Sequence, residues 1–208
     1  MLTDKNYEEL EKKYGKYSSW ALWNLDPAEG KQHYKQVGFQ TFESKINDPN
    51  FRKTHIKTSA IILNTNWSSG GKTHQKNWQD FHNTELSHGH DYTLAKLFLN
   101  TPFEGCYITD IIKSFPETNS NKVLQYVKNP KNIGKLKESA EMFNDELAII
   151  QPQRLIVLGK NTLDILKYMQ NKQNLIDISN LQVSEFDHFS KVQSKEKFQN
   201  EHEAIVKL

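Results

Sequence analysis

The sequence contains a single cysteine, Cys106, among its 208 residues. One cysteine cannot form an intrachain disulfide, a four-cysteine zinc site or a four-cysteine iron–sulfur cluster. Arginine is almost as scarce, because only Arg52 and Arg154 interrupt a basic complement that is otherwise lysine. Asparagine is also abundant, which indicates a compositional bias, so the lysine count does not by itself predict phosphate binding.

Long apolar runs are also missing. No stretch approaches the ~18 residues of a membrane span, and the first ten residues lack the apolar segment of a signal peptide. We therefore expect a cytoplasmic protein. Charged residues make up 25% of the chain and aromatic residues 11%, which predicts a folded chain with a polar surface and a modest core. A net charge of +2 neither requires nor excludes a polyanionic partner.

A chain of this length fits one domain with an additional arm. Residues 1–57 are rich in aromatic side chains and in helical patterns, so we expect a helical arm packed on the main body. Helical spacing is clearest over 3–14, a further helix is expected over 31–46, and 48–50 read as a turn. Residues 58–208 form the predicted main domain.

The main domain alternates short apolar runs with helical stretches. The runs are 60–63, 106–109, 155–158 and 181–186. The first three have the apolar character of parallel strands buried on both faces, and the fourth alternates like an edge strand. Helices are expected between them, most clearly over 134–150, with a closing helix within 191–207. The pattern predicts an α/β fold: a three-layer α/β/α sandwich around a short, mainly parallel four-stranded sheet.

A polar segment follows each predicted strand. Ligands of open parallel sheets bind beyond the carboxyl ends of the strands, so these segments locate the expected site. They are 64–71, 110–113, 159–161 and 187–190. We expect them to converge on one crevice.

Together these segments resemble the uracil-DNA glycosylase superfamily over residues 58–190. Residues 61–68, Ile-Ile-Leu-Asn-Thr-Asn-Trp-Ser, stand where the family has a strand that ends in a motif such as Gly-Ile-Asn-Pro-Gly. Residues 107–113, Tyr-Ile-Thr-Asp-Ile-Ile-Lys, are similar to the Ile-Thr-Asn-Val-Val-Lys segment of the thermophile-type branch. Residues 155–159 resemble the third strand of that branch, and residues 188–190, His-Phe-Ser, stand in for His-Pro-Ser.

The resemblance implies a monofunctional DNA N-glycosylase that needs no cofactor and binds single- or double-stranded DNA. By position in the motifs, Asn66 orients the attacking water and His188 donates a hydrogen bond to O2 of the departing base. Asp110 stands at the position that reads the base edge. These roles match what cleavage of an N-glycosidic bond requires, since a flipped base leaves as a stabilised anion.

Other residues would surround the base. The resemblance places around it Asn64, Thr65, Trp67 and Ser190. In this superfamily an aromatic ring that stacks on the flipped base, the aromatic floor of the site, usually lies 12 to 15 residues after the water-positioning residue. Phe81 is the candidate there, with Trp78 as the alternate. The competing interpretation is that both rings belong to the core.

The DNA backbone has weaker candidates. Gly70 and Gly71 would allow a close approach to phosphate, and Lys113 would supply charge. A flexible glycine loop and a solvated lysine account for the same residues.

The chain also departs from the family motifs. The substituted positions are Asn64 for glycine, Trp67 for proline, Ser68 for glycine and Phe189 for proline. Asp110 replaces the base-reading asparagine, and an ionised aspartate only accepts hydrogen bonds and repels uracil O4. A protonated Asp110 suits cytosine, which has a donor at N4 and an acceptor at N3. Because one cysteine cannot hold the cluster of the thermophile-type branch, the resemblance is to a divergent, cluster-free member.

Two other functions stay open. One is a metal-dependent hydrolase that would use a group of potential ligands within 74–91, namely His74, His82, His88, His90 and Asp91. Their spacing matches no zinc signature, so we expect no bound metal. The other is an inactive member of the same fold that binds nucleic acid or a base without cleaving it, which the substitutions at 64, 67 and 110 favour.

Overall fold

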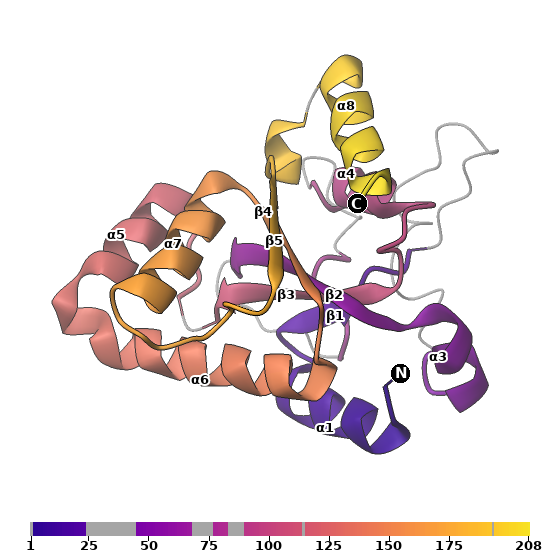
Figure 1. Cartoon of the computed structure of the whole chain (residues 1–208), viewed down its shortest axis with the longest axis horizontal. Coiled ribbons are helices and arrows are strands. Elements are labelled where there is room, and N and C mark those ends of the chain that lie inside the picture. Colours follow the sequence, from indigo (N-terminus) through magenta and orange to yellow (C-terminus); the bar gives the residue numbers. More distant parts are fainter. Residues whose placement is uncertain (1, 24–44, 68–76, 83–89, 114, 193) are drawn as a thin grey trace.

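The computed structural model describes residues 2–23, 45–67, 77–82, 90–113, 115–192 and 194–208, and within them it shows an α/β protein (Figure 1). The strands are β1 (Ser18–Trp20), β2 (Lys57–Asn66), β3 (Cys106–Ile112), β4 (Arg154–Leu158) and β5 (Gln182–Phe186). The helices are α1 (Asp4–Tyr14), α3 (Pro49–His55), α4 (Asp91–Phe98), α5 (Ser120–Lys128), α6 (Ile133–Ile150), α7 (Lys160–Asn171) and α8 (Lys195–Val206), with 3₁₀ turns η3 (Pro130–Asn132) and η4 (Phe189–Lys191).

Five strands in the described part of the chain form one sheet in the order β1-β3-β2-β4-β5. Strands β2 to β5 are parallel to one another, and β1 pairs antiparallel with β3. The four predicted strands are confirmed, but the predicted strand count is wrong because the N-terminal arm adds β1. The sequence Ser-Ser-Trp has no apolar alternation, and all three residues are buried because this short strand pairs with β3 beneath α1.

The sheet has a hydrophobic cluster on each face, and alternate residues of β2 belong to the two clusters. Ile61 and Leu63 face the side that α1, α5, α6 and α7 cover, which we call the α6 face. Ala60 and Ile62 face the side that α4, η4 and α8 cover, which we call the α4 face. The two helical layers lie on opposite sides of the strands in Figure 1.

Helix α6 confirms the prediction over 134–150. Its buried positions include Leu136, Ala140, Phe143 and Ile150, at the spacing expected for one face. Gln151, with φ 52°, ends the helix in a left-handed conformation just before Pro152. Helix α8 likewise confirms the expected closing helix.

Helix α3 corrects the turn expected over 48–50. The side chain of Asp48 accepts a hydrogen bond from the backbone N–H of Asn50 at 2.9 Å, and Pro49 is the first helical residue. Asp-Pro serves a turn and a helix N-terminus equally well, because proline fixes φ at a value that both use. Most of the helix expected over 31–46 lies outside the described residues.

Aromatic side chains attach the N-terminal arm to the sheet. The ring of Trp20 lies 5.2 Å from that of Tyr107 and 5.7 Å from that of Trp78, centroid to centroid. Trp78 donates from Nε1 to the hydroxyl of Tyr7 at 2.8 Å. These rings are fully or almost fully buried, so the arm forms part of the hydrophobic core.

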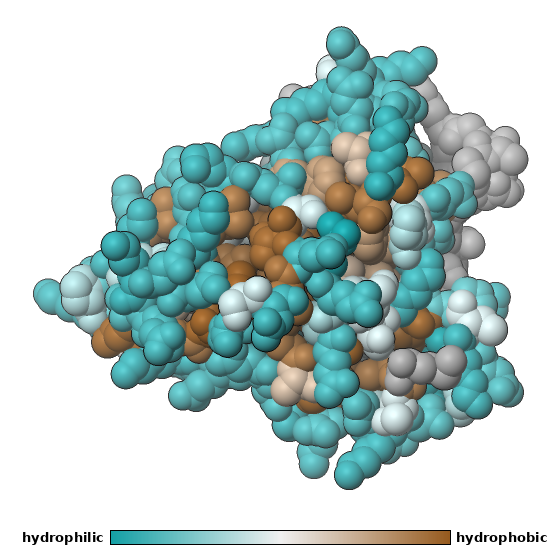
Figure 2. All heavy atoms as spheres, in the orientation of Figure 1, coloured by the Kyte–Doolittle hydropathy of each residue, from teal (hydrophilic) through white to brown (hydrophobic). Residues whose placement is uncertain are grey.

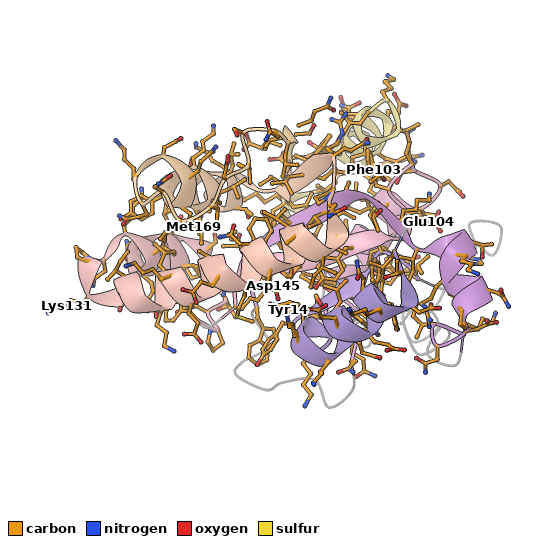
Figure 3. All side chains as sticks on the ribbon, turned by 60° about the horizontal axis from the view of Figure 1, so that its bottom comes forward. Tyr14, Phe103, Glu104, Lys131, Asp145 and Met169 are labelled. Atoms are coloured by element: carbon orange, nitrogen blue, oxygen red, sulfur yellow. The ribbon has the colours of Figure 1, made fainter. Side chains whose placement is uncertain are left out.

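Helices α1 and α6 also meet at the surface. Tyr14 donates its hydroxyl hydrogen to a carboxylate oxygen of Asp145 at 2.6 Å, and Figure 3 shows the two side chains side by side. Lys13 reaches the same oxygen at 2.9 Å. This contact fixes α1 across the C-terminal half of α6.

Polar residues dominate the surface seen in Figure 2, where hydrophilic atoms surround a smaller group of apolar residues near the centre of the view. This distribution agrees with the polar surface expected from the composition. Among the helices described here, none combines the length and the apolar character needed to cross a bilayer.

Candidate functional site

The carboxyl ends of β2, β3, β4 and β5 lie at one edge of the sheet because these strands are parallel. Predicted site residues lie near the ends of β2 and β3 and directly after β5. Asn64 to Trp67 end β2, Asp110 lies near the end of β3, and His188 follows β5. The segments were expected to converge on one crevice; the parallel strands place their described residues at one edge of the sheet, and the crevice stays a prediction. Gly70 and Gly71 lie outside the described residues.

Asn64 and Asp110 are direct partners in the parallel register of β2 and β3. They follow Ile62 and Ile108 by two residues, so both side chains belong to the α4 face. Asn64 is 3% exposed and Asp110 is 2% exposed. Both polar atoms of the Asn64 amide and Oδ1 of Asp110 lack a hydrogen-bond partner in the described structure. Each such atom costs about 1 to 3 kcal/mol unless a ligand or water satisfies it.

The surroundings of Asp110 favour its protonated form. Burial is the main cause that raises its pKa well above the ordinary value of 3.8, and the carboxylate of Asp80 adds to the effect. Lys113 opposes it, while Glu146 and Asp91 reinforce it. A carboxyl group in this setting keeps a proton to donate.

Lys113 does not reach the surface, which corrects its predicted contact with the DNA backbone. Its side chain is 1% exposed and its ammonium lies 2.8 Å from Oε2 of Glu146. The ammonium also donates to the Thr109 hydroxyl at 2.8 Å and to the carbonyl of Asp110 at 2.6 Å. A buried charge needs such partners, so Lys113 supports the end of β3 from the α6 face.

Glu146 is a buried partner that the sequence analysis missed. Its Oε1 accepts hydrogen bonds from the hydroxyls of Tyr107 at 2.8 Å and Thr109 at 2.9 Å. The signal for its burial was its spacing, three residues after Phe143 and four before Ile150 on a helix whose apolar face was recognised. Glu146 therefore joins α6 to the strand that carries Asp110.

His188 begins η4 directly after β5. Its Nδ1 accepts a hydrogen bond from the backbone N–H of Ser190 at 3.2 Å and lies 2.7 Å from the Ser190 hydroxyl oxygen. Because Nδ1 is an acceptor, the proton of the neutral ring lies on Nε2. Burial lowers the pKa of His188 to about 4, with smaller contributions from His90 and Lys191. At neutral pH, His188 is thus an uncharged donor with a fixed tautomer.

Gly159 gives His188 the space to approach the end of β4. Its φ of +95° lies in the region that favours glycine, and a Cβ at this position would lie 3.1 Å from the Cβ of His188. The backbone N–H of Gly159 donates to the carbonyl of Phe186 at 2.8 Å. Gly159 also directly precedes α7.

Asn66 joins the end of β2 to the loop that follows β3. Its Nδ2 donates to the carbonyl oxygens of Glu117 at 2.8 Å, Phe115 at 3.0 Å and Trp67 at 3.1 Å. These contacts hold the amide in one orientation, so its role in positioning water depends on Oδ1. That role stays a prediction.

The neighbours of Asn66 point in different directions. Thr65 lies on the α6 face, where its hydroxyl is 2.6 Å from that of Thr162 on α7, so it does not share the face of Asn64. Trp67 is half-buried, and its Nε1 lacks a hydrogen-bond acceptor in the part of the chain that is described. Trp67 therefore offers a further donor at the end of β2.

The two candidate floor residues lie on opposite sides of the sheet. Trp78 is 1% exposed and packs with Tyr7 and Trp20 on the α6 face, so its assignment as an alternate floor is wrong. Phe81 belongs to the cluster on the α4 face, the side of Asn64 and Asp110. It is 8% exposed and has a left-handed φ of 62°. Its packing agrees with a core residue, and base stacking stays a prediction.

The histidines of the metal alternative do not assemble in the described residues. Both ring nitrogens of His82 contact backbone carbonyl oxygens, Nδ1 that of Asp80 at 2.8 Å and Nε2 that of Leu22 at 3.0 Å. His90 is exposed at the start of α4, and His74 and His88 lie outside the described residues. No group of three potential ligands is arranged for a metal within that part of the chain.

No protein-family model matches this chain, and the search of curated proteins found no match. Function must therefore be inferred from the site. Its central features are the His188 donor and the unsatisfied pair formed by Asn64 and Asp110.

Proposed function

We propose that the protein is a DNA glycosylase-like hydrolase that cleaves the N-glycosidic bond of a damaged or deaminated base flipped out of DNA. The observation that carries the proposal is His188 at the carboxyl edge of the sheet, a neutral histidine whose Nδ1 accepts from Ser190, so that its ring proton lies on Nε2. Helices on both faces of the sheet suit the α/β/α sandwich of the superfamily that the sequence resembles.

His188 would act on the departing base. When the bond between C1′ and the base nitrogen breaks, the electron pair stays with the base and spreads to O2. A donor fixed at that oxygen stabilises the charge as it develops. A neutral imidazole donates without first being protonated, so its depressed pKa is compatible with this role at neutral pH.

Asn66 would act on the sugar. Water adds to C1′ of the oxocarbenium-like sugar and then loses a proton to the base anion or to solvent, which balances the hydrolysis. An amide is a weak base, so Asn66 would orient the water through Oδ1 and would not deprotonate it. Its three contacts through Nδ2 would hold that orientation, and we expect slow turnover.

Asp110 would read the base. Its carboxyl group is buried at the end of β3 with Oδ1 unsatisfied, and its surroundings keep it protonated. A protonated carboxyl presents both a donor and an acceptor, as the family asparagine does. Neutralisation also removes the repulsion that an ionised Asp110 would exert on a departing base anion.

The DNA backbone would contact lysines that flank the catalytic edge. Lys160 follows Gly159, and Lys191 lies three residues after His188; both are exposed. Lys191 is close enough for its charge to act on the pKa of His188. These two lysines replace Lys113 in the proposal.

The second candidate is a module that binds a base without cleaving it. The unsatisfied atoms of Asn64 and Asp110 favour recognition of a polar ligand whether or not a bond is broken. The metal-hydrolase alternative is weaker, because the ring nitrogens of His82 already contact carbonyl oxygens.

An excision assay tests the proposal. Single- and double-stranded oligonucleotides that carry uracil, hypoxanthine, xanthine or a mismatch are incubated with the protein, and abasic sites are then cleaved with alkali. We expect product that persists in EDTA and is lost in His188→Ala and Asn66→Ala. His55→Ala, which removes an exposed histidine on α3, is the matched control and should retain activity.

The other outcomes identify the alternatives. Product that EDTA abolishes would favour a metal-dependent hydrolase. Absence of product from every substrate, with measurable binding to the same oligonucleotides, would favour the binding module. Full activity in His188→Ala would contradict the proposed mechanism.

A further inference from the structure

Asn64 and Asp110 form a buried polar pair whose hydrogen-bonding groups are only partly used within the described structure. They are register partners on adjacent parallel strands, whose backbones lie about 4.8 Å apart. Three of their side-chain polar atoms lack hydrogen-bond partners in the part of the chain described. Native proteins rarely leave such atoms unsatisfied, so two adjacent residues that do so point to a polar ligand or a water as the missing partner.

The charges around the pair decide what Asp110 offers to a ligand. Asp80, before α4, and Asp91, on α4, face it with negative charge, as does Glu146 on α6. The opposing cation is Lys113, but its ammonium is held by Glu146 at 2.8 Å and is not placed on the Asp110 carboxyl. Ionisation of Asp110 would add a buried negative charge to this group, so the neutral carboxyl is favoured.

A neutral carboxyl group can present its donor and acceptor in either order. The proton resides on one oxygen or the other without movement of heavy atoms, so each oxygen donates or accepts. Asn64 adds an NH₂ donor and a carbonyl acceptor beside it. A lactam edge has an N–H next to C=O, whereas an amidine edge has a bare ring nitrogen next to NH₂. The pair has the groups to satisfy both.

We propose, on the basis of the proposed function, that Asn64 and Asp110 read the edge of the flipped base and accept both lactam edges, as in uracil, and amidine edges, as in cytosine. Asp110 contacts ring N3 and the exocyclic group at C4, and the Asn64 amide, without rotating, contacts that exocyclic group through its NH₂ or through the carbonyl oxygen beside it. The substrate class is then a pyrimidine-type ring with adjacent donor and acceptor in either order. This differs from the expectation that aspartate at this position disfavours uracil.

Binding of free bases tests the pair without any cleavage. Titration calorimetry with 1-methyluracil and 1-methylcytosine should give wild-type affinities within about tenfold of each other. Asp110→Leu and Asn64→Leu, which keep the approximate size of the side chains, should each weaken both ligands by about tenfold or more. Asp177→Asn, at an exposed aspartate before β5, is the control and should bind like the wild type.

Asp110→Asn keeps one donor and one acceptor, but an amide donates only from its nitrogen and accepts only at its oxygen. In a site this buried, rotation of the amide is restricted, so the variant should prefer one of the two bases by about tenfold more than the wild type does. Circular dichroism and thermal unfolding establish that each variant is folded. A wild type that binds only one of the two bases, or an unchanged preference in Asp110→Asn, would overturn the proposal.

The pH dependence gives a second readout. Because Asp110 must be protonated to donate, binding of both bases should weaken as pH rises through its ionisation, and Asp110→Asn should lose this dependence. The same dependence in the variant would contradict the assignment.

Failure of the base-recognition proposal for Asn64 and Asp110 and failure of the glycosylase proposal give different results. If no oligonucleotide is cleaved but both bases bind in a manner that depends on Asp110, the glycosylase proposal fails and the base-recognition proposal is supported. If uracil is excised while Asp110→Leu alters neither excision nor binding, the base-recognition proposal fails and the glycosylase proposal is supported.

Discussion

Among single residues, Gly159 decides how closely His188 can approach the end of β4. Its positive φ favours glycine, and a Cβ at position 159 would lie 3.1 Å from the Cβ of His188, which is closer than most Cβ contacts. The proposed donor therefore depends on a residue that carries no functional group. Glycine after an apolar strand is the only local signal for this role.

Gly159→Ala should shift His188 and reduce base excision, and should destabilise the protein by about 1 to 3 kcal/mol because alanine is strained at this φ. Excision assays and urea unfolding measure the two effects. Gly134→Ala on α6 is the control, since a Cβ there meets nothing within 4 Å, and helix propensity predicts equal or slightly higher stability. Equal behaviour of the two variants would refute the role of Gly159.

His188 should also make stability depend on pH. Its pKa is about 4 in the folded protein against an ordinary value of 6.5, so the unfolded chain binds more protons between these values. The stabilisation is complete above 6.5 and is lost as pH falls toward 4. Urea unfolding should show a smaller decrease over this interval in His188→Gln than in the wild type. His55→Gln, at an exposed histidine on α3, is the control substitution.

At the scale of elements, the ion pair between Lys113 and Glu146 holds α6 against β3. Both side chains are almost fully buried, and the Tyr107 and Thr109 hydroxyls complete the coordination of Glu146. The Tyr107 hydroxyl oxygen also lies 2.7 Å from the Ser18 hydroxyl oxygen. The hydroxyl of Tyr107 and the carboxylate of Glu146 thus connect β1, β3 and α6 on the α6 face of β3, the strand that carries Asp110.

Lys113→Met should destabilise the protein by roughly 3 to 5 kcal/mol, because it leaves Glu146 buried without its cation. Adding Glu146→Gln should recover part of the loss, so that the double variant is less destabilised than the sum of the single variants. Denaturant unfolding measures this coupling. Lys135→Met, which removes an exposed pair with Glu138 on α6, should change stability little. Additive effects of the two buried substitutions would contradict the pairing.

The residue pattern of each strand explains why four strands were predicted correctly and the fifth was missed. Strands β2, β3 and β4 are apolar on both faces, and the buried positions of α6 follow helical spacing, so their own residues specify them. β1 has three residues and no such pattern. It is a strand because β3 offers an unpaired edge and α1 covers it.

For the whole molecule, the weak net charge means that DNA binding must depend on local charge at the catalytic edge. Lys160 and Lys191 flank Gly159 and His188 there, whereas Lys53 lies on α3, before the amino end of β2. Each lysine that neutralises a phosphate adds about 0.7 to 0.9 to the slope of log affinity against log salt.

Replacing Lys160 and Lys191 together by glutamine should weaken DNA binding and lower the salt slope by roughly 1.4 to 1.8. Fluorescence anisotropy with a labelled oligonucleotide over a series of salt concentrations measures the slope. Lys53→Gln is the matched control and should keep the wild-type slope. Wild-type binding that is independent of salt would argue against nucleic acid as the partner.

The sequence by itself determined the α/β class, the four parallel strands and the edge at which polar residues gather, because hydrophobic periodicity and strand direction are properties of local segments. The tertiary structure decided which of those residues are available. Lys113 and Trp78 are buried on the α6 face by partners distant in sequence. Asn64 and Asp110 become a pair only through the register of β2 and β3, since pairing between strands brings together residues that no local pattern connects.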